Sequence, residues 1–185
     1  MWEWSKSLLK KNKKRAPLQS SFSDLFPATS PQHKEETILS PEEMLEYLLI
    51  KIKKLNLKNI ELRECAFFPQ TWGEMTKNTT QYQRMRKTFL KLIGYSHQEE
   101  CKKIGFDEED MELLKNKKSP ENYNVHIKIP LEFGGKLEIS NLSLIITHPL
   151  HDNIHSLIEE QISCGFLQKY KFVYIPWFSG SFYYD

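Results

Sequence analysis

The sequence predicts an α+β fold in which helices precede a pair of strands and a further helix follows that pair. Apolar residues recur at helical spacing in segments 41–55 and 79–93. Short apolar runs typical of strands occupy 125–130 and 141–147, and 148–162 is again a predicted helix. The 185 residues are enough for one hydrophobic core with extensions at both ends.

Residues 1–40 are expected to form an extended basic arm without a core of its own, because prolines and polar residues dominate it and no period is sustained. Such a basic block suits a phosphate backbone or an anionic membrane. A solvated tail and a weak organellar targeting signal are the alternatives. The arm residues expected to contact nucleic acid are Lys10, Lys11, Lys13, Lys14 and Arg15.

The first predicted helix begins after Ser40, because this serine can cap it and Glu43 can complete a capping box. Segment 59–68 is a predicted strand, so that 41–70 form a helix-and-strand extension. The helix is expected to turn five apolar side chains inward: Leu45, Leu48, Leu49, Ile52 and Leu55.

A second helix is expected over 79–93, with Gly94 ending it, and a short helix follows at 107–116. The outer face of the second helix is basic and could contact phosphate, although most such faces are merely solvated. The residues assigned to nucleic-acid binding on this face are Arg84, Arg86 and Lys87, next to Lys91. The inward side chains are Tyr82, Met85, Phe89, Leu92 and Ile93.

Three histidines are candidate metal ligands. His151 and His155 are four residues apart, so on a helix they share one face and both imidazoles can reach one cation. His126 could supply a third nitrogen, and Asn141 could hydrogen-bond across the intervening loop and brace the strand that carries His126. Three neutral imidazoles suit Zn²⁺ or another first-row divalent ion better than Mg²⁺. The alternative is that the histidines hold no metal and only pack the strands on the helix.

The order of these features resembles the HNH nucleases, and most closely HNH toxin domains whose motif reads V-H-H-K-x-P-L-x-x-G-G, then N-L-x-L-I, then P-x-H. The matching segments here are 125–131, 134–135, 141–145 and 149–151. The resemblance covers an HNH-like domain at about 71–163. It implies a ββα-metal core, in which a two-stranded hairpin packs on a helix around one divalent metal held by the three histidines.

The chain departs from this motif at Ile127, where the family has the histidine that acts as general base. An aliphatic side chain cannot accept a proton, and general-base catalysis is typically worth about 100- to 10,000-fold. His148, three residues before His151, is a candidate substitute, with an ordinary surface histidine as the alternative. Glu132 and Glu138, which flank the turn, could also bind a water on the metal, although exposed hairpin carboxylates are common. No catalytic residue is therefore assigned.

The cysteines and the hydropathy pattern indicate the kind of cellular compartment in which the protein is expected. Cys65, Cys101 and Cys164 form no paired framework, which favours an intracellular, reducing compartment. No apolar run approaches the roughly 20 residues of a membrane span. The tail at 164–185 is rich in aromatic residues, which are expected either to complete the core or to form a docking surface.

The expected function is that of a catalytically impaired protein with the HNH nuclease fold, acting as a nucleic-acid-binding or structural component of a larger assembly. A mitochondrial ribosome is one such assembly, with RNA favoured over DNA and with neighbouring proteins as further partners. One alternative is an active metal-dependent HNH endonuclease of the toxin or mobile-element type. Another is an accessory subunit that docks on protein through its aromatic tail.

Overall fold

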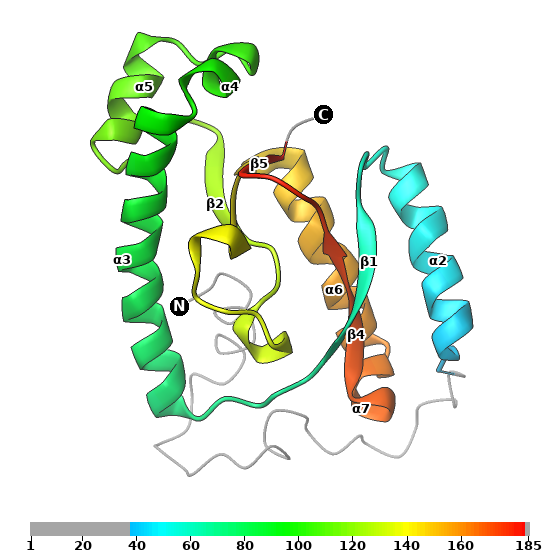
Figure 1. The fold of residues 1–185 in the computed structure, drawn as a ribbon. Helices are drawn as coiled ribbons and strands as arrows, with labels where there is room; N and C mark the ends of the chain where they lie inside the picture. The colour runs from blue at the N-terminus through cyan, green and yellow to red at the C-terminus, as the bar shows by residue number, and fades with distance from the viewer. Residues whose placement is uncertain (1–37, 184–185) are drawn as a thin grey trace, which may run out of the picture.

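The structure is a computed structural model, and it describes residues 38–183. The predicted contacts of Lys10, Lys11, Lys13, Lys14 and Arg15 lie outside the described residues. The α+β prediction is confirmed, since helices surround two small sheets (Figure 1). In chain order the elements are α2 (Pro41–Lys54), β1 (Glu61–Ala66), α3 (Trp72–Ser96), α4 (Gln98–Lys103), α5 (Glu108–Lys115), β2 (Tyr123–Ile127), β3 (Leu142–Ile146), α6 (Asp152–Ser163), α7 (Phe166–Tyr170), β4 (Phe172–Trp177) and β5 (Phe182–Tyr183).

The first sheet is an antiparallel hairpin of β2 and β3, to which β5 adds in parallel. The hairpin register places His126 opposite Ser143 and Ile127 opposite Leu142. Because neighbouring side chains on a strand point to opposite faces, this register decides which side chains share a face.

The two faces of the hairpin pack against different helices. Val125, Ile127 and Leu144 join one buried cluster with residues of α3. Ile145 joins another with Ile154 of α6. By strand alternation His126 and Ser143 lie on the α6 side. Figure 1 shows β2 between α3 and α6. The hairpin therefore separates the α3 side of the molecule from the α6 side.

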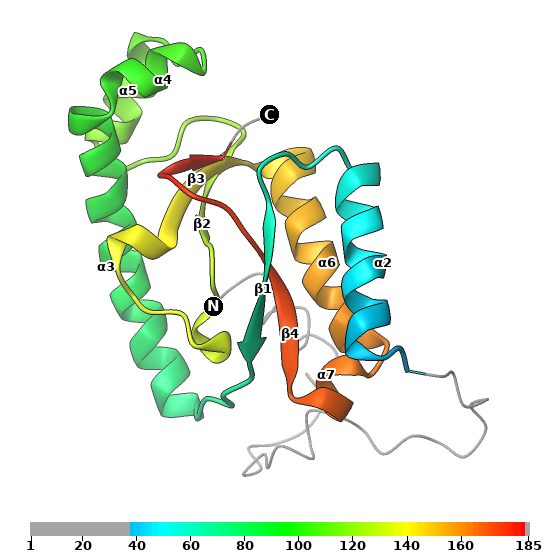
Figure 2. The same cartoon turned by 45° about the vertical axis from the view of Figure 1, so that its right-hand side comes forward.

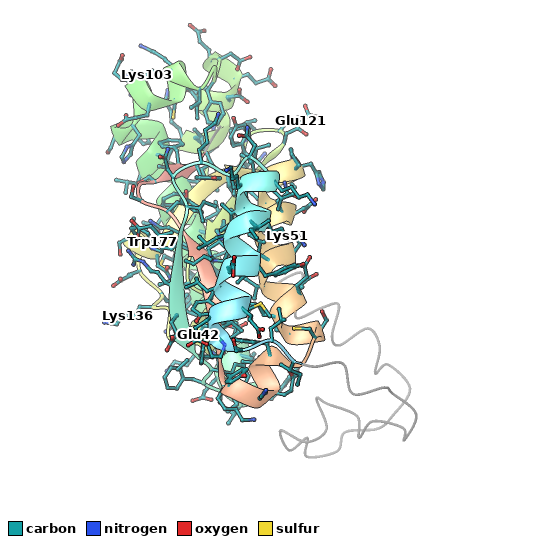
Figure 3. The ribbon with its side chains drawn as sticks, turned by 90° about the vertical axis from the view of Figure 1, so that its right-hand side faces the viewer. Glu42, Lys51, Lys103, Glu121, Lys136 and Trp177 are labelled. Carbon is teal, nitrogen blue, oxygen red and sulfur yellow. The ribbon has the colours of Figure 1, made fainter. Side chains whose placement is uncertain are left out.

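The second sheet consists of β1 and β4, which pair antiparallel with Cys65 opposite Val173. Figure 2 shows α2 and α6 side by side, next to this strand pair. Leu48 of α2, Leu157 of α6 and Tyr174 of β4 share one buried cluster. Lys51, labelled on α2 in Figure 3, forms an ion pair with Glu160 of α6 and so adds a polar link between the two helices. The aromatic segment that follows Ser163 thus contributes to the core, through Phe166, Phe178 and Tyr183.

The first helix follows the prediction at its start and departs from it on its outer face. Ser40 and Glu43 form the predicted capping box. Leu49, however, is 51% exposed, and Met44 takes the buried position instead. Met44, Leu48 and Ile52 recur every four residues and form the buried stripe, while Leu45 and Leu55 pack half-buried against the same cluster.

The second helix is longer than predicted at both ends. It starts at Trp72, because Thr71 and Glu74 form a capping box. Gly94 does not end it, since the helix continues to Ser96. A Cβ atom at Gly94 would lie 2.9 Å from the backbone nitrogen of Lys115, so this glycine allows α3 and α5 to approach closely. Leu92 is exposed, and Leu90 is buried in its place.

Candidate metal centre

Three imidazoles from three segments of the chain converge on the α6 side of the hairpin. His126 belongs to β2, His151 ends the turn Thr147–His151, and His155 lies in the first turns of α6. One ring nitrogen from each histidine lies within 4.8 Å of the other two. The Nε2 atoms of His151 and His155 are 3.1 Å apart. Around a tetrahedral Zn²⁺ with Zn–N bonds of about 2.0 Å, ligand nitrogens lie roughly 3.3 Å apart. The group could therefore hold a metal ion.

The His126 ring is enclosed by the protein. Its side chain is 3% exposed, and Phe178 stacks on it with a centroid distance of 6.1 Å. Its Nε2 atom is buried without a hydrogen-bond partner among the described residues. Buried polar atoms are rarely left unpaired. An orphaned imidazole nitrogen beside two further imidazoles fits the donor set of a first-row divalent ion, as predicted from the sequence.

Burial favours the neutral form of His126 and His155, which is the form that binds a metal. It lowers the pKa of His126 well below its usual value, and nearby His155 and His151 lower it further. Burial, with a contribution from His151, also lowers the pKa of His155 to about 4, and Asp152 opposes that shift only in part. At pH 7 both imidazoles therefore have a lone pair to donate.

Acid is expected to destabilise the metal-free protein in a defined range. An unfolded histidine takes up a proton near pH 6.5, whereas folded His155 resists protonation down to about pH 4. The unfolded state thus binds more protons between these values, and stability falls as the pH falls. We expect His155 to account for about 2 kcal/mol of this loss, allowing for its partial exposure. Urea titrations of the wild type and of His155→Gln at several pH values test this, and identical pH profiles would contradict it.

Asn141 fixes the loop between the two strands. Its Oδ1 accepts the backbone N–H of Ile129 at 3.0 Å, and its Nδ2 donates to the carbonyls of Ile129 at 2.8 Å and Lys136 at 3.0 Å. The side chain therefore braces the chain just after β2 and its His126. Gly135 lies against the same stretch, because a Cβ atom there would overlap the carbonyl oxygen of Ile129.

Ile127 points away from the three histidines. It is 5% exposed and packs in the cluster on the α3 side of the hairpin, with Phe89 and Leu142. Ile127, which the resemblance places at the general-base position, thus lies on the other face of the strand from His126. The sequence alone shows that isoleucine replaces the histidine of the motif. Which way the Ile127 side chain points depends on the register and packing of the folded hairpin.

His148 does not join the three histidines. Its backbone is not helical, because the helix begins only after this residue. Its side chain is exposed, and its Nδ1 contacts the carboxylate of Asp152. The structure therefore places the candidate substitute base outside the metal-binding group.

The predicted basic face of α3 is only partly as expected. Arg84 and Lys87 are exposed. Arg86 is half-buried, and its Nη2 donates to Ser119 Oγ at 2.7 Å. Its guanidinium therefore bonds within the protein and does not extend from the basic face. Lys91 is exposed on this face as expected, and Lys77 is an additional exposed cation. Lys77 was missed because the helix was expected to begin two residues after it.

Comparisons of the chain with protein-family models, with curated proteins and with solved structures found no match. Within residues 38–183, no helix is both long and apolar enough to cross a membrane. The fold and the site thus define an α+β protein with a three-histidine group that could hold a metal ion.

Proposed function

We propose that the chain is a catalytically impaired protein of the HNH-type ββα architecture, which binds a divalent metal and serves as a nucleic-acid-binding component of a larger assembly. One observation carries the proposal. His126 on the hairpin and His151 and His155 at the helix converge on one point, while Ile127 faces the opposite side. This pattern supports a retained metal site without the family's general base.

The surroundings of the site support impaired catalysis. A divalent ion held there would act as a Lewis acid on a phosphoryl oxygen. The chain's own residues would then have to remove a proton from the attacking water, and a general base must lie within hydrogen-bond reach of it. Among the described residues, the candidate metal-binding group consists of the three imidazoles, and all three are needed as ligands. The ring of Phe178, stacked on His126, offers no proton acceptor.

The wild type is expected to cleave plasmid DNA and RNA no faster than His151→Ala, with Mg²⁺, Mn²⁺, Ni²⁺ or Zn²⁺. Ile127→His is expected to gain no activity and to lose about 2–4 kcal/mol of stability, because its imidazole would enter an apolar core. Gel assays and urea unfolding measure both effects. Cleavage by the wild type that disappears in His151→Ala would favour the alternative, an active metal-dependent endonuclease of the toxin or mobile-element type. That alternative is supported by the retained histidines and Asn141.

A stripe of cations on α3 supports nucleic-acid binding. Lys77, Arg84, Lys87 and Lys91 are exposed, and their spacing places them along one side of the helix. The stripe spans about 21 Å at 1.5 Å per residue. None of the four forms an ion pair with another described residue, and Glu74 is the only acid in α3. A row of unpaired cations suits a phosphate backbone.

The position of this stripe also favours binding over cleavage. Phe89 and Ile93 turn the opposite side of α3 toward the hairpin, and the three histidines lie beyond it, on the α6 side. A nucleic acid held on the outer side of α3 would therefore not present its phosphates to the metal centre. A mitochondrial ribosome is one assembly that offers RNA to such a surface, with neighbouring proteins as additional partners.

Removing the stripe is expected to weaken RNA binding and its dependence on salt. The variant replaces Lys77, Arg84, Lys87 and Lys91 by glutamine. Each phosphate contact contributes about 0.7–0.9 to the slope of log K against log salt concentration, so the slope of this variant should be shallower by about 3. Fluorescence anisotropy with single-stranded RNA, duplex RNA and DNA measures this slope.

The matched control replaces four exposed lysines elsewhere, Lys53, Lys54, Lys103 and Lys118, by glutamine and changes the net charge equally. This control should keep most of the affinity. Equal losses in the two variants would contradict a defined phosphate-binding face. No binding by the wild type would favour an accessory subunit that docks only on protein.

A further inference from the structure

Two buried side-chain polar atoms lack a hydrogen-bond partner among the described residues, and they belong to paired residues. One is Nε2 of His126, and the other is Oγ of Ser143. These two residues lie directly opposite each other in the β2–β3 register. Both side chains are almost completely buried, with Ser143 at 0% exposure. Both buried side-chain atoms without a partner in the described residues therefore belong to one residue pair of the hairpin.

The two side chains also share a face. Side chains that are paired across an antiparallel hairpin point the same way, with Cβ atoms about 4.5–5.5 Å apart. The flanking residues Leu142 and Leu144 face α3, so Ser143 faces α6 together with His126. His151 and His155 lie on that side. Ser143 is therefore next to the metal centre, although it is not one of the three candidate ligands.

A structural role does not account for this serine. Buried hydroxyl groups in strands normally bond to a backbone carbonyl or to another side chain. Gln161, another buried polar residue of this side, has its amide bonded to Leu157 and Tyr174. Ser143 has no such partner within residues 38–183. An alanine would fill the same position without leaving a polar atom unpaired.

A metal-bound imidazole creates the partner that the hydroxyl lacks. A neutral histidine that binds a cation through one ring nitrogen carries its proton on the other. That N–H almost always donates to an oxygen, which fixes the tautomer and the ring orientation. Phe178 stacks on the ring of His126 but offers no acceptor. Rotation about the Cα–Cβ bond moves Ser143 Oγ among three staggered positions on this face.

We propose that Ser143 is a positioning residue of the metal centre: its hydroxyl accepts the hydrogen bond from the ring nitrogen of His126 that does not face the metal. This inference rests on the metal binding proposed above. It assigns a role to the variable position of the N-L-x-L-I segment at 141–145. It also explains why the two unpaired buried side-chain atoms belong to residues that are paired across the hairpin.

The test compares Zn²⁺ affinity, measured by competition with a chelator, in the full chain and three variants. Ser143→Ala is expected to bind Zn²⁺ about 10- to 100-fold more weakly. Ser143→Thr, which keeps the hydroxyl, should restore most of the affinity. Ser156→Ala is the matched control, because Ser156 is next to His155 but its hydroxyl already donates to the carbonyl of Asn153. This control should bind Zn²⁺ like the wild type.

Two further measurements separate positioning from packing. Without metal, the melting temperature of Ser143→Ala should not fall, because the substitution removes an unpaired buried hydroxyl. In ¹⁵N-histidine NMR spectra of the Zn²⁺-loaded wild type, the His126 ring N–H should exchange slowly with solvent. In Ser143→Ala that signal should shift or disappear.

The outcomes distinguish this inference from the proposed metal binding. If the wild type binds no Zn²⁺, the proposed metal binding is wrong, and so is the proposed role of Ser143. If the wild type binds Zn²⁺ and Ser143→Ala binds it equally well, the metal centre stands and the positioning role is overturned. A weaker affinity that accompanies a lower metal-free melting temperature, and that threonine does not restore, would overturn it in favour of packing.

Discussion

Zn²⁺ is expected to stabilise the folded protein by about 2.7 kcal/mol when free Zn²⁺ is present at 100 times its dissociation constant. The physical reason is that the three nitrogens meet only in the folded chain, since His126 is 25 residues from the nearest other ligand in the sequence. An ion that binds the folded state alone shifts the equilibrium toward it. Thermal unfolding in chelator and in increasing Zn²⁺ measures the effect.

His155→Ala is expected to abolish most of this Zn²⁺-dependent stabilisation, because two imidazoles hold the ion much less tightly than three. His148→Ala is the matched control. It makes the same chemical change seven residues away, in an exposed side chain outside the group. It should keep the full response to Zn²⁺. A response lost equally in both variants would show that Zn²⁺ binds elsewhere on the protein.

Gly135→Ala is expected to destabilise the protein by about 4 kcal/mol or more, which is among the largest effects of a single substitution. An alanine Cβ would overlap the carbonyl oxygen of Ile129 and lie 2.9 Å from that of Pro130. Both contacts are with backbone, so no side chain can move aside. The displaced segment includes Ile129, whose N–H and C=O are held by Asn141. The variant should therefore also bind Zn²⁺ more weakly.

Gly73→Ala provides the control for this substitution. Gly73 lies in the first turn of α3, where a Cβ atom would meet nothing within 4 Å. The same change should there be neutral or stabilising by up to about 1 kcal/mol, because alanine favours helices over glycine. Urea unfolding of the two variants should thus give free-energy changes of opposite sign. If alanine at 135 is tolerated, residue 135 does not lie against the Ile129 carbonyl as it does in the structure, and the prediction is wrong.

Local chemistry made parts of this fold predictable from the sequence. The capping box joins Ser40 and Glu43, which are only three residues apart. His151 and His155 share a helix face because of helix geometry alone. Asn141 was predictable as a brace because it follows the loop after the strand that carries His126, although its bonds to Ile129 span twelve residues. The first two predictions concern residues that are close together in the chain.

The features that were missed depend on contacts between distant segments. Gly94 looked like a helix end, but α5 packs against it and the helix continues. The direction of Ile127 follows from which hairpin face meets α3. The pairing of His126 with Ser143 depends on a register that the sequence does not show. Thr71 is different, since it and Glu74 form a capping box that was visible in the sequence but was overlooked.

The pairing of β1 with β4 limits how the protein can be divided for experiments. A fragment cut to residues 71–163 would keep all three histidines, yet it would lose Leu48, Tyr174 and Phe178, which pack against the hairpin and α6. Phe178 also covers the ring of His126. Such a minimal fragment would expose the inner side of α6 to water and would aggregate rather than report on the metal centre. Affinity tags and truncations should accordingly leave both residues 38–66 and residues 166–183 in place.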